Sequence, residues 1–277
     1  MNKKDLLIEI GTEELPPKSL WRLATAFADE IQSGLDKKDL GHNKCACYAT
    51  PRRMAVLVAD LDTAQKNQSI QRRGPAINAA FDDAGNPSKA AEGFARSCGV
   101  EVSELDTLEN DKGAWLSYQT MSEGKATKDL LQEIIDTSIN KLPIPKRMRW
   151  GDKDVEFVRP VHWSLVLLGD EIIPCKILGT TAGNITYGHR FHNPDPIELT
   201  SPSEYVEVLK TKGQVIADFD ERKIKIRNIV KDAAKDQNGV AAGIDENDEK
   251  LLDEVTSLVE WPVAIIGSYD RKFLELP

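Results

Sequence analysis

The segment from Leu6 to Gly34 constrains the fold most, because a strand pattern runs directly into a helix pattern. Leu6–Gly11 is apolar and β-branched and ends at a glycine, which is typical of a strand. After Pro16 and Pro17, apolar residues recur at helical spacing as far as Gly34. Such a helix needs an apolar surface to cover, so the segment predicts a helix packed on a sheet.

Similar patterns alternate along the rest of the chain. A long strand or a hairpin is expected within residues 45–62, and strands are expected within 105–121 and 161–178, with a short one at 214–217 and a terminal one at 262–267. Helices are expected within 88–99, 127–142, 201–213, 218–233 and 251–259. The prediction is an α+β fold with mixed, mostly antiparallel sheets, packed helices and two lobes. Pro143 and Pro145 mark the expected boundary between residues 1–143 and 144–277.

Composition limits the class of protein. The 277 residues carry a net charge of −9, so any contact with nucleic acid has to be local. There is no apolar run of membrane-spanning length and no secretion signal, which predicts a cytoplasmic protein without a membrane partner. The four cysteines have neither zinc spacing nor the spacing of a disulfide framework.

Two basic islands interrupt the acidic chain. Between Lys141 and Trp163 there are six cations and three anions, and between Thr50 and Pro75 there are five cations and two anions. Arginine binds phosphate through its planar fork, and tryptophan offers a flat face to a base. Nucleic-acid contact is therefore one interpretation. The other is structural, because arginine stacked on tryptophan also stabilises protein cores.

Three of the four histidines, His162, His189 and His192, follow strand or loop patterns. In an extended segment, residues at i and i+3 point to opposite faces, so His189 and His192 are poor partners for a zinc ion. Contact with a base or phosphate, or structural hydrogen bonding, remains open. The chain has no phosphate-binding loop, dinucleotide fingerprint, nucleophile elbow or HExxH motif. We expect no catalytic residue and no metal site, although a hydrolase or editing site using these histidines with Asp195 is an alternative.

Eight segments, taken together, resemble the β subunit of bacterial heterotetrameric glycyl-tRNA synthetase from about Leu6 to Pro277. They are Leu6–Pro16, Thr50–Arg53, Arg72–Ala76, Gly93–Arg96, Lys146–Gly151, Arg159–Trp163, Gly188–His192 and Glu260–Val263.

This resemblance implies an α2β2 ligase that attaches glycine to tRNA(Gly). The α subunit would hold the class II active site with ATP and magnesium, so no cofactor is expected in this chain. A full β subunit would also carry an HD-type helical domain and an anticodon-binding domain. The expected partners are therefore the α subunit, tRNA(Gly) and the remaining domains of β, and the chain would be an N-terminal portion.

The basic islands would then touch tRNA phosphates and position its acceptor end, which phosphate contacts do without specifying sequence. The alternative is a scaffold that joins subunits without nucleic-acid contact. The residues predicted to bind tRNA are Arg52, Arg53, Arg72, Arg73, Lys146, Arg147, Arg149, Trp150, Arg159, His189, Arg190 and His192.

Overall fold

The computed structural model describes residues 2–82, 85–111, 113–244, 248–268, 270, 272 and 273. Contacts between residues divide the chain into two compact units. Unit 1 contains residues 1–64 and 126–277, and unit 2 contains residues 65–125. The units differ from the predicted lobes, because strand β9 (Val161–Leu168), beyond the expected boundary, pairs with β1 (Lys3–Thr12) in one sheet. One sheet therefore contains strands from both predicted lobes, and the expected boundary at residues 143 and 144 falls inside unit 1.

Unit 1 is built on a five-stranded sheet with strand order β10-β9-β1-β3-β2, in which every pair is antiparallel. The α+β prediction is confirmed. Besides β1 and β9, its helices and strands follow in chain order: α1 (Pro17–Lys37), β2 (Cys45–Thr50), β3 (Arg53–Asp62), α4 (Thr127–Asn140), β7 (Met148–Arg149), β8 (Glu156–Phe157), β10 (Glu171–Ile172), β11 (Lys176–Ile177), β12 (Thr180–Thr181), β13 (Ile185–Tyr187), β14 (Pro196–Glu198), η2 (Pro202–Glu204), α5 (Tyr205–Thr211), α6 (Phe219–Asp236) and α7 (Glu249–Thr256).

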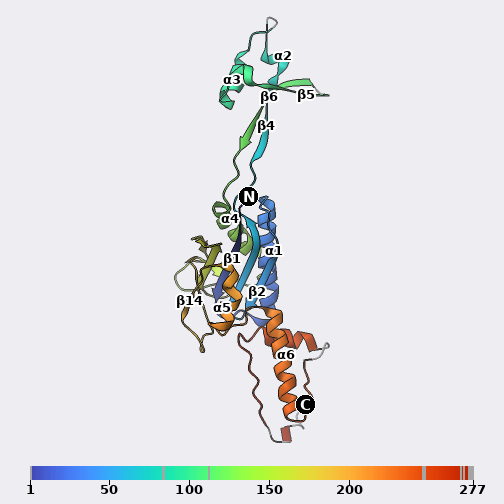
Figure 1. Cartoon of the computed structure of the whole chain (residues 1–277), viewed down its shortest axis with the longest axis vertical. Helices are drawn as coiled ribbons and strands as arrows, with labels where there is room; N and C mark the ends of the chain where they lie inside the picture. The colour runs from blue at the N-terminus through green and yellow to red at the C-terminus, as the bar shows by residue number, and fades with distance from the viewer. Residues whose placement is uncertain are drawn as a thin grey trace. The chain divides into compact units, whose positions relative to one another are not determined.

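Alternation along the strands gives the sheet two buried faces. Leu6, Ile8 and Ile10 of β1 belong to a core with the apolar sides of α1 and α4, which lie beside the sheet in Figure 1. Leu7 belongs to a second core on the opposite face, together with Leu165 of β9 and residues of α5. Burial on both faces explains why these central strands are almost continuously apolar.

Three predicted strands differ from the structure. The partner of β9 expected over 172–178 pairs only through Glu171 and Ile172, because Pro174 has no N–H to continue the ladder. Residues 214–217 are not a strand, although Ile216 N donates to the carbonyl of Glu260 at 3.0 Å. Residues 262–267 are also not a strand and lie largely exposed.

Unit 2 is a small α+β body of its own. Its elements are β4 (Gln68–Ala76), α2 (Ile77–Ala80), α3 (Lys89–Cys98), η1 (Val102–Glu104), β5 (Asp106–Asn110) and β6 (Gly113–Ser122). The sheet order is β4-β6-β5, and Leu116 packs with Ala80 and Ala91 of the helices. Ser88 caps α3 and Gly99 ends it in the left-handed region at φ 76°, and the helix lies within the predicted range 88–99. None of the helices in the described ranges is long and apolar enough to cross a lipid bilayer.

Unit 2 leaves unit 1 and returns to it at neighbouring positions, since Ala64 and Ala126 form an antiparallel bridge. The cores of unit 1 contain no described residue of unit 2.

Replacing residues 65–125 by an Asn-Gly turn is therefore expected to leave unit 1 folded with a cooperative urea transition. Near-ultraviolet circular dichroism would check this, because the deletion removes only Trp115 among the five tryptophans. Loss of the cooperative transition would contradict it.

Candidate functional site

Three strands of unit 1 bring polar side chains to one end of a sheet face. Gly11 of β1 pairs with Arg53 on one side and with Trp163 on the other, so these three residues form a row across the sheet. A Cβ on Gly11 would lie 1.9 Å from the Trp163 ring, so the indole covers this glycine directly. Glu9, two residues earlier, points to the same face as Gly11.

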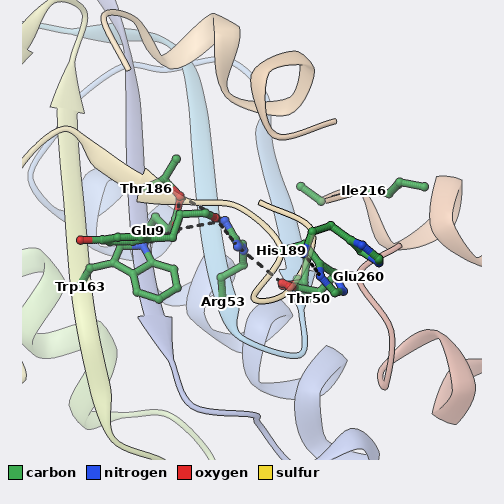
Figure 2. A network of polar contacts seen from close by, with 12 residues as sticks. Glu9, Thr50, Arg53, Trp163, Thr186, His189, Ile216 and Glu260 are labelled. Atoms are coloured by element: carbon green, nitrogen blue, oxygen red, sulfur yellow. Dashed lines mark hydrogen bonds and ion pairs between the residues drawn. The ribbon is translucent and has the colours of Figure 1, made fainter. Parts of the chain in front are cut away.

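A buried polar network forms around this row (Figure 2). Glu9 accepts hydrogen bonds from the indole Nε1 of Trp163 at 2.6 Å and from the hydroxyl of Thr186 at 2.8 Å. Arg53 lies between two carboxylates, 3.6 Å from Glu9 and 3.5 Å from Glu260. Burial disfavours its charge, but Glu260 and Glu9 outweigh that cost and raise the pKa of Arg53. All three charged side chains are buried.

The carbonyl and hydroxyl groups around Arg53 complete this network. Arg53 donates to the Thr186 hydroxyl at 3.1 Å and to the Tyr187 carbonyl at 2.7 Å. Thr50 donates to Glu260 at 2.6 Å. The network therefore ties the β2–β3 turn to the 186–187 segment and to the chain near residue 260.

Arg52, the neighbour of Arg53, lines an open pocket of about 200 Å³. Its guanidinium lies 5.7 Å from the centre of the Trp163 ring. The lining consists of Arg52, His162, Trp163, Tyr187, Gly188, Arg190 and Pro194. Three motifs that are distant in the sequence, around residues 52, 162 and 190, therefore meet at this pocket.

Glu13 supports the pocket from outside its lining. Its carboxylate accepts a hydrogen bond from Arg190 at 2.5 Å and lies 3.0 Å from Nε2 of His162. The Arg190 hydrogen bond lowers the pKa of Glu13; burial opposes this, and His162 adds to it. An ionised Glu13 thus orients two pocket side chains at once.

The loop that carries Arg190 is fixed by close backbone packing. A Cβ on Gly188 would lie 2.4 Å from the carbonyl oxygen of Asn193 and 2.8 Å from that of Gly213. His189 N donates to the Gly213 carbonyl at 2.7 Å. The segment is not extended, and its turn brings the rings of His189 and His192 to 4.3 Å between centroids. The opposite-face geometry expected for an extended segment is therefore wrong here.

The first basic island is partly structural. Arg147 donates to the carbonyls of Ile139 and Asn140, both at 3.3 Å, and closes the end of α4. Arg159 donates to the carbonyl of Glu14 at 3.0 Å. Trp150 packs against the larger core of unit 1.

The rest of this island is accessible. Arg149 pairs with Asp154 at 2.8 Å, but its side chain is 58% exposed. Lys146 is exposed and has no hydrogen bond or ion pair with a described residue. Lys146 and Arg159 also border an apolar groove of about 430 Å³ that includes Leu23, Ile144 and Met148.

The remaining predicted cations, Arg72 and Arg73, belong to unit 2. Arg72 donates to the carbonyl of Ser97 on α3 at 2.8 Å. The guanidinium of Arg73 stacks on Trp115, 3.6 Å from the ring centre. Both residues are exposed.

Several buried polar and charged residues of this region were not predicted from the sequence. Glu9, Glu260 and Thr186 were not predicted as site residues. Arg222 on α6 is fully buried, and it donates to the carbonyls of Ile216 at 2.5 Å and Ala49 at 2.7 Å. Burial lowers the pKa of Arg222 to about 10. A charge inside an apolar strand, as at Glu9, was the one available signal.

Two groups of side chains contain residue types that are common in catalytic sites. Sγ of Cys45 lies 3.8 Å from Nδ1 of His42, whose Nε2 lies 3.1 Å from Asp36. Burial and then Asp36 raise the pKa of Cys45, so it stays a thiol near neutral pH. Of the histidines and Asp195 in the editing alternative, only His162 lines the pocket. The described residues contain no group of three or more histidine, cysteine or acidic side chains that would hold a metal ion.

Comparison with known proteins gives one consistent result. The family model for the glycyl-tRNA synthetase beta subunit matches residues 6–277. The chain is 51% identical to the glycine–tRNA ligase beta subunit of Hahella chejuensis (strain KCTC 2396) and 48% identical to that of Marinobacter nauticus (strain ATCC 700491 / DSM 11845 / VT8). Both alignments cover the whole chain, which spans 40% of the length of each relative. The chain therefore belongs to the glycyl-tRNA synthetase beta subunit family.

Proposed function

We propose that this chain is a non-catalytic part of the beta subunit of a glycine–tRNA ligase that positions tRNA(Gly) and joins subunits. The ligase would act in the cytoplasm as an α2β2 assembly, with ATP and magnesium bound by the α subunit. The chain's own contribution would be contacts to tRNA phosphates and to its partner domains. Family membership supports the ligase role, since the relatives are named glycine–tRNA ligase beta subunits.

The pairing of the predicted cations supports tRNA contact. Nine of the predicted residues are arginine or lysine, and six of them have no carboxylate of a described residue within 4.0 Å. The six are Arg52, Arg72, Arg73, Lys146, Arg147 and Arg159. A chain that only joined subunits would not require cations that are unpaired with its own carboxylates. Three of the six, Arg72, Arg73 and Lys146, are exposed, and exposed cations without carboxylate partners are what phosphate binding requires.

A scaffold role is the second candidate, and the apolar groove beside Lys146 favours it. The groove exposes Met148 and is lined by Ile144, Pro145 and Val158, which gives an apolar centre with Lys146 and Arg159 at its rim. Protein interfaces combine an apolar centre with a polar rim in this way. Subunit joining and tRNA contact are compatible on one chain.

Substituting both Lys146 and Arg149 by alanine is expected to weaken tRNA(Gly) binding by the assembled ligase at low salt. Removing two phosphate contacts should lower the slope of log affinity against log salt by about 2. Fluorescence anisotropy at several salt concentrations measures this slope. Both side chains are exposed, so the substitutions leave the cores intact.

The matched control replaces Lys128 and Lys210 by alanine. These exposed lysines pair with Glu171 and Glu221 outside the basic islands, so the change in net charge is identical. The control should keep the parental slope. If the Lys146/Arg149 variant binds like its parent at every salt concentration, the first island does not contact tRNA.

A further inference from the structure

The lining of the pocket beside Trp163 carries basic side chains. Arg52, His162 and Arg190 line it, and no carboxylate is among the lining residues. Glu13 is not a lining residue, but its carboxylate forms an ion pair with Arg190 and lies 3.0 Å from His162. Arg52 forms no ion pair with a described residue, and Glu260 and Glu13 favour its charge only from a greater distance.

Arg52 also lacks hydrogen-bond acceptors. Its Nε is buried and has no hydrogen-bond partner, and no described acceptor lies within bonding distance of the rest of its guanidinium. Burial disfavours the charge of Arg52 and lowers its pKa, with Glu260 opposing this. A partly desolvated guanidinium with unused donors is best satisfied by an anionic oxygen group that accepts several hydrogen bonds.

The position of Arg52 is set before any ligand arrives. Its carbonyl accepts a hydrogen bond from Thr12 N at 2.8 Å, and the carbonyl of Pro51 accepts one from Leu15 N at 2.7 Å. The network around Arg53 holds the next residue, and Trp163 supports the guanidinium plane. A ligand would therefore meet a guanidinium carried on a backbone that is already ordered.

Size narrows the class of ligand. A volume of about 200 Å³ is below the range of roughly 300–1,000 Å³ typical of sites for whole cofactors or drug-sized ligands. The pocket is open to solvent, so a small group attached to a larger molecule can enter. One tetrahedral phosphate group, approached by Arg52 and Arg190, matches both the volume and the charge.

We propose that the pocket lined by Arg52, His162 and Arg190 binds a single phosphate group of an RNA strand. This rests on the proposed function only for the source of the phosphate, because the chemistry of the pocket stands without it. The first basic island would act through many exchangeable contacts, whereas this pocket would fix one phosphate at one position. Glu13 is then a positioning residue that holds His162 and Arg190 toward the ligand.

The Nε–H resonance of Arg52 gives a direct test on the 15N-labelled chain. Inorganic phosphate and a single-stranded RNA trinucleotide are titrated separately while this resonance is followed by NMR. We expect a saturable shift with both probes, and saturation by RNA at the lower concentration. The Nε–H resonance of Arg22, an exposed arginine on α1, serves as the reference for non-specific ionic effects and should move without saturating.

Variants separate the pocket from general charge effects. Arg52→Gln is expected to weaken trinucleotide binding about tenfold to a hundredfold, because it removes charge-assisted hydrogen bonds. Arg190→Gln should have a smaller effect in the same direction, and Arg52→Lys should restore part of the affinity. Arg22→Gln, an exposed arginine on α1, should change nothing. Near-ultraviolet circular dichroism confirms that each variant keeps the environment of Trp163.

The outcomes distinguish this proposal from the tRNA-contact proposal. An Arg52 resonance that never saturates, or folded Arg52→Gln and Arg190→Gln variants that bind the trinucleotide like the parent, would overturn the pocket. Saturation by inorganic phosphate but not by RNA would overturn the RNA source. Neither result alters the salt slopes of the Lys146/Arg149 variant, which report on the first island alone.

Discussion

Replacing Arg53 by methionine is expected to lower the free energy of unfolding by about 3–5 kcal/mol, as for other buried ion pairs that lose one partner. Glu9 and Glu260 would remain buried with no opposite charge between them. The hydroxyl of Thr186 and the carbonyl of Tyr187 would each lose a hydrogen bond from Arg53. Urea denaturation followed by tryptophan fluorescence measures the change.

The same substitution at an exposed site supplies the control. Arg149→Met removes an ion pair with Asp154 in which both side chains are largely exposed, so the expected cost is about 0–1 kcal/mol. Combining Arg53→Met with Glu9→Gln and Glu260→Gln should recover part of the loss, because no charge is then left buried and unpaired. Equal effects at residues 53 and 149 would show that Arg53 is not held as a buried charge.

Local patterns were sufficient to predict the elements that begin the chain. The β1 and α1 segments and the strand structure predicted within 45–62 agree with the structure because alternation, helical spacing and turn residues act over a few positions. Pro174 ended the β9 partner early, and the terminal segment 262–267 forms no strand despite its β-branched residues. A strand needs a neighbour with free hydrogen-bonding groups, which the sequence alone does not identify.

The division into units depended on long-range pairing. β9 lies about 150 residues after β1 in the chain, yet the two strands are neighbours in the sheet. The prolines at 143 and 145 do end a helix, but they lie inside unit 1. Unit 2 is inserted between Ala64 and Ala126, and no proline lies within ten residues of either junction.

In the candidate site, the surroundings of single residues also depend on long-range partners that the sequence does not identify. Arg52 and Arg53 were predicted together as phosphate ligands, and nothing in their sequence distinguishes them. Arg53 begins β3 and turns into the buried network, whereas Arg52 belongs to the preceding turn and lines the pocket. Because successive side chains leave the backbone in different directions, adjacent arginines acquire different surroundings. The partners Glu9 and Glu260 decide which of the two is structural.

Gly11→Ala is expected to destabilise unit 1 by about 3 kcal/mol or more. The new Cβ would lie within 2.3 Å of three atoms of the Trp163 ring, and forcing extra volume into a packed site costs about 1–3 kcal/mol. A displaced indole also loses its hydrogen bond to Glu9, and bonds to charged groups contribute about 1.5–3 kcal/mol. The two contributions overlap because both arise from movement of one ring.

Gly183→Ala is the matched control in the same unit. No atom lies within 4 Å of its added Cβ, and its backbone is outside the left-handed region, so the expected change is small. Urea denaturation compares the two variants, and tryptophan fluorescence reports whether the Trp163 environment has changed. If Gly11→Ala proved as stable as Gly183→Ala, Trp163 would have room to move. The pocket wall beside Arg52 would then be adjustable rather than fixed by the sheet, and the weakening expected for Arg52→Lys would shrink accordingly.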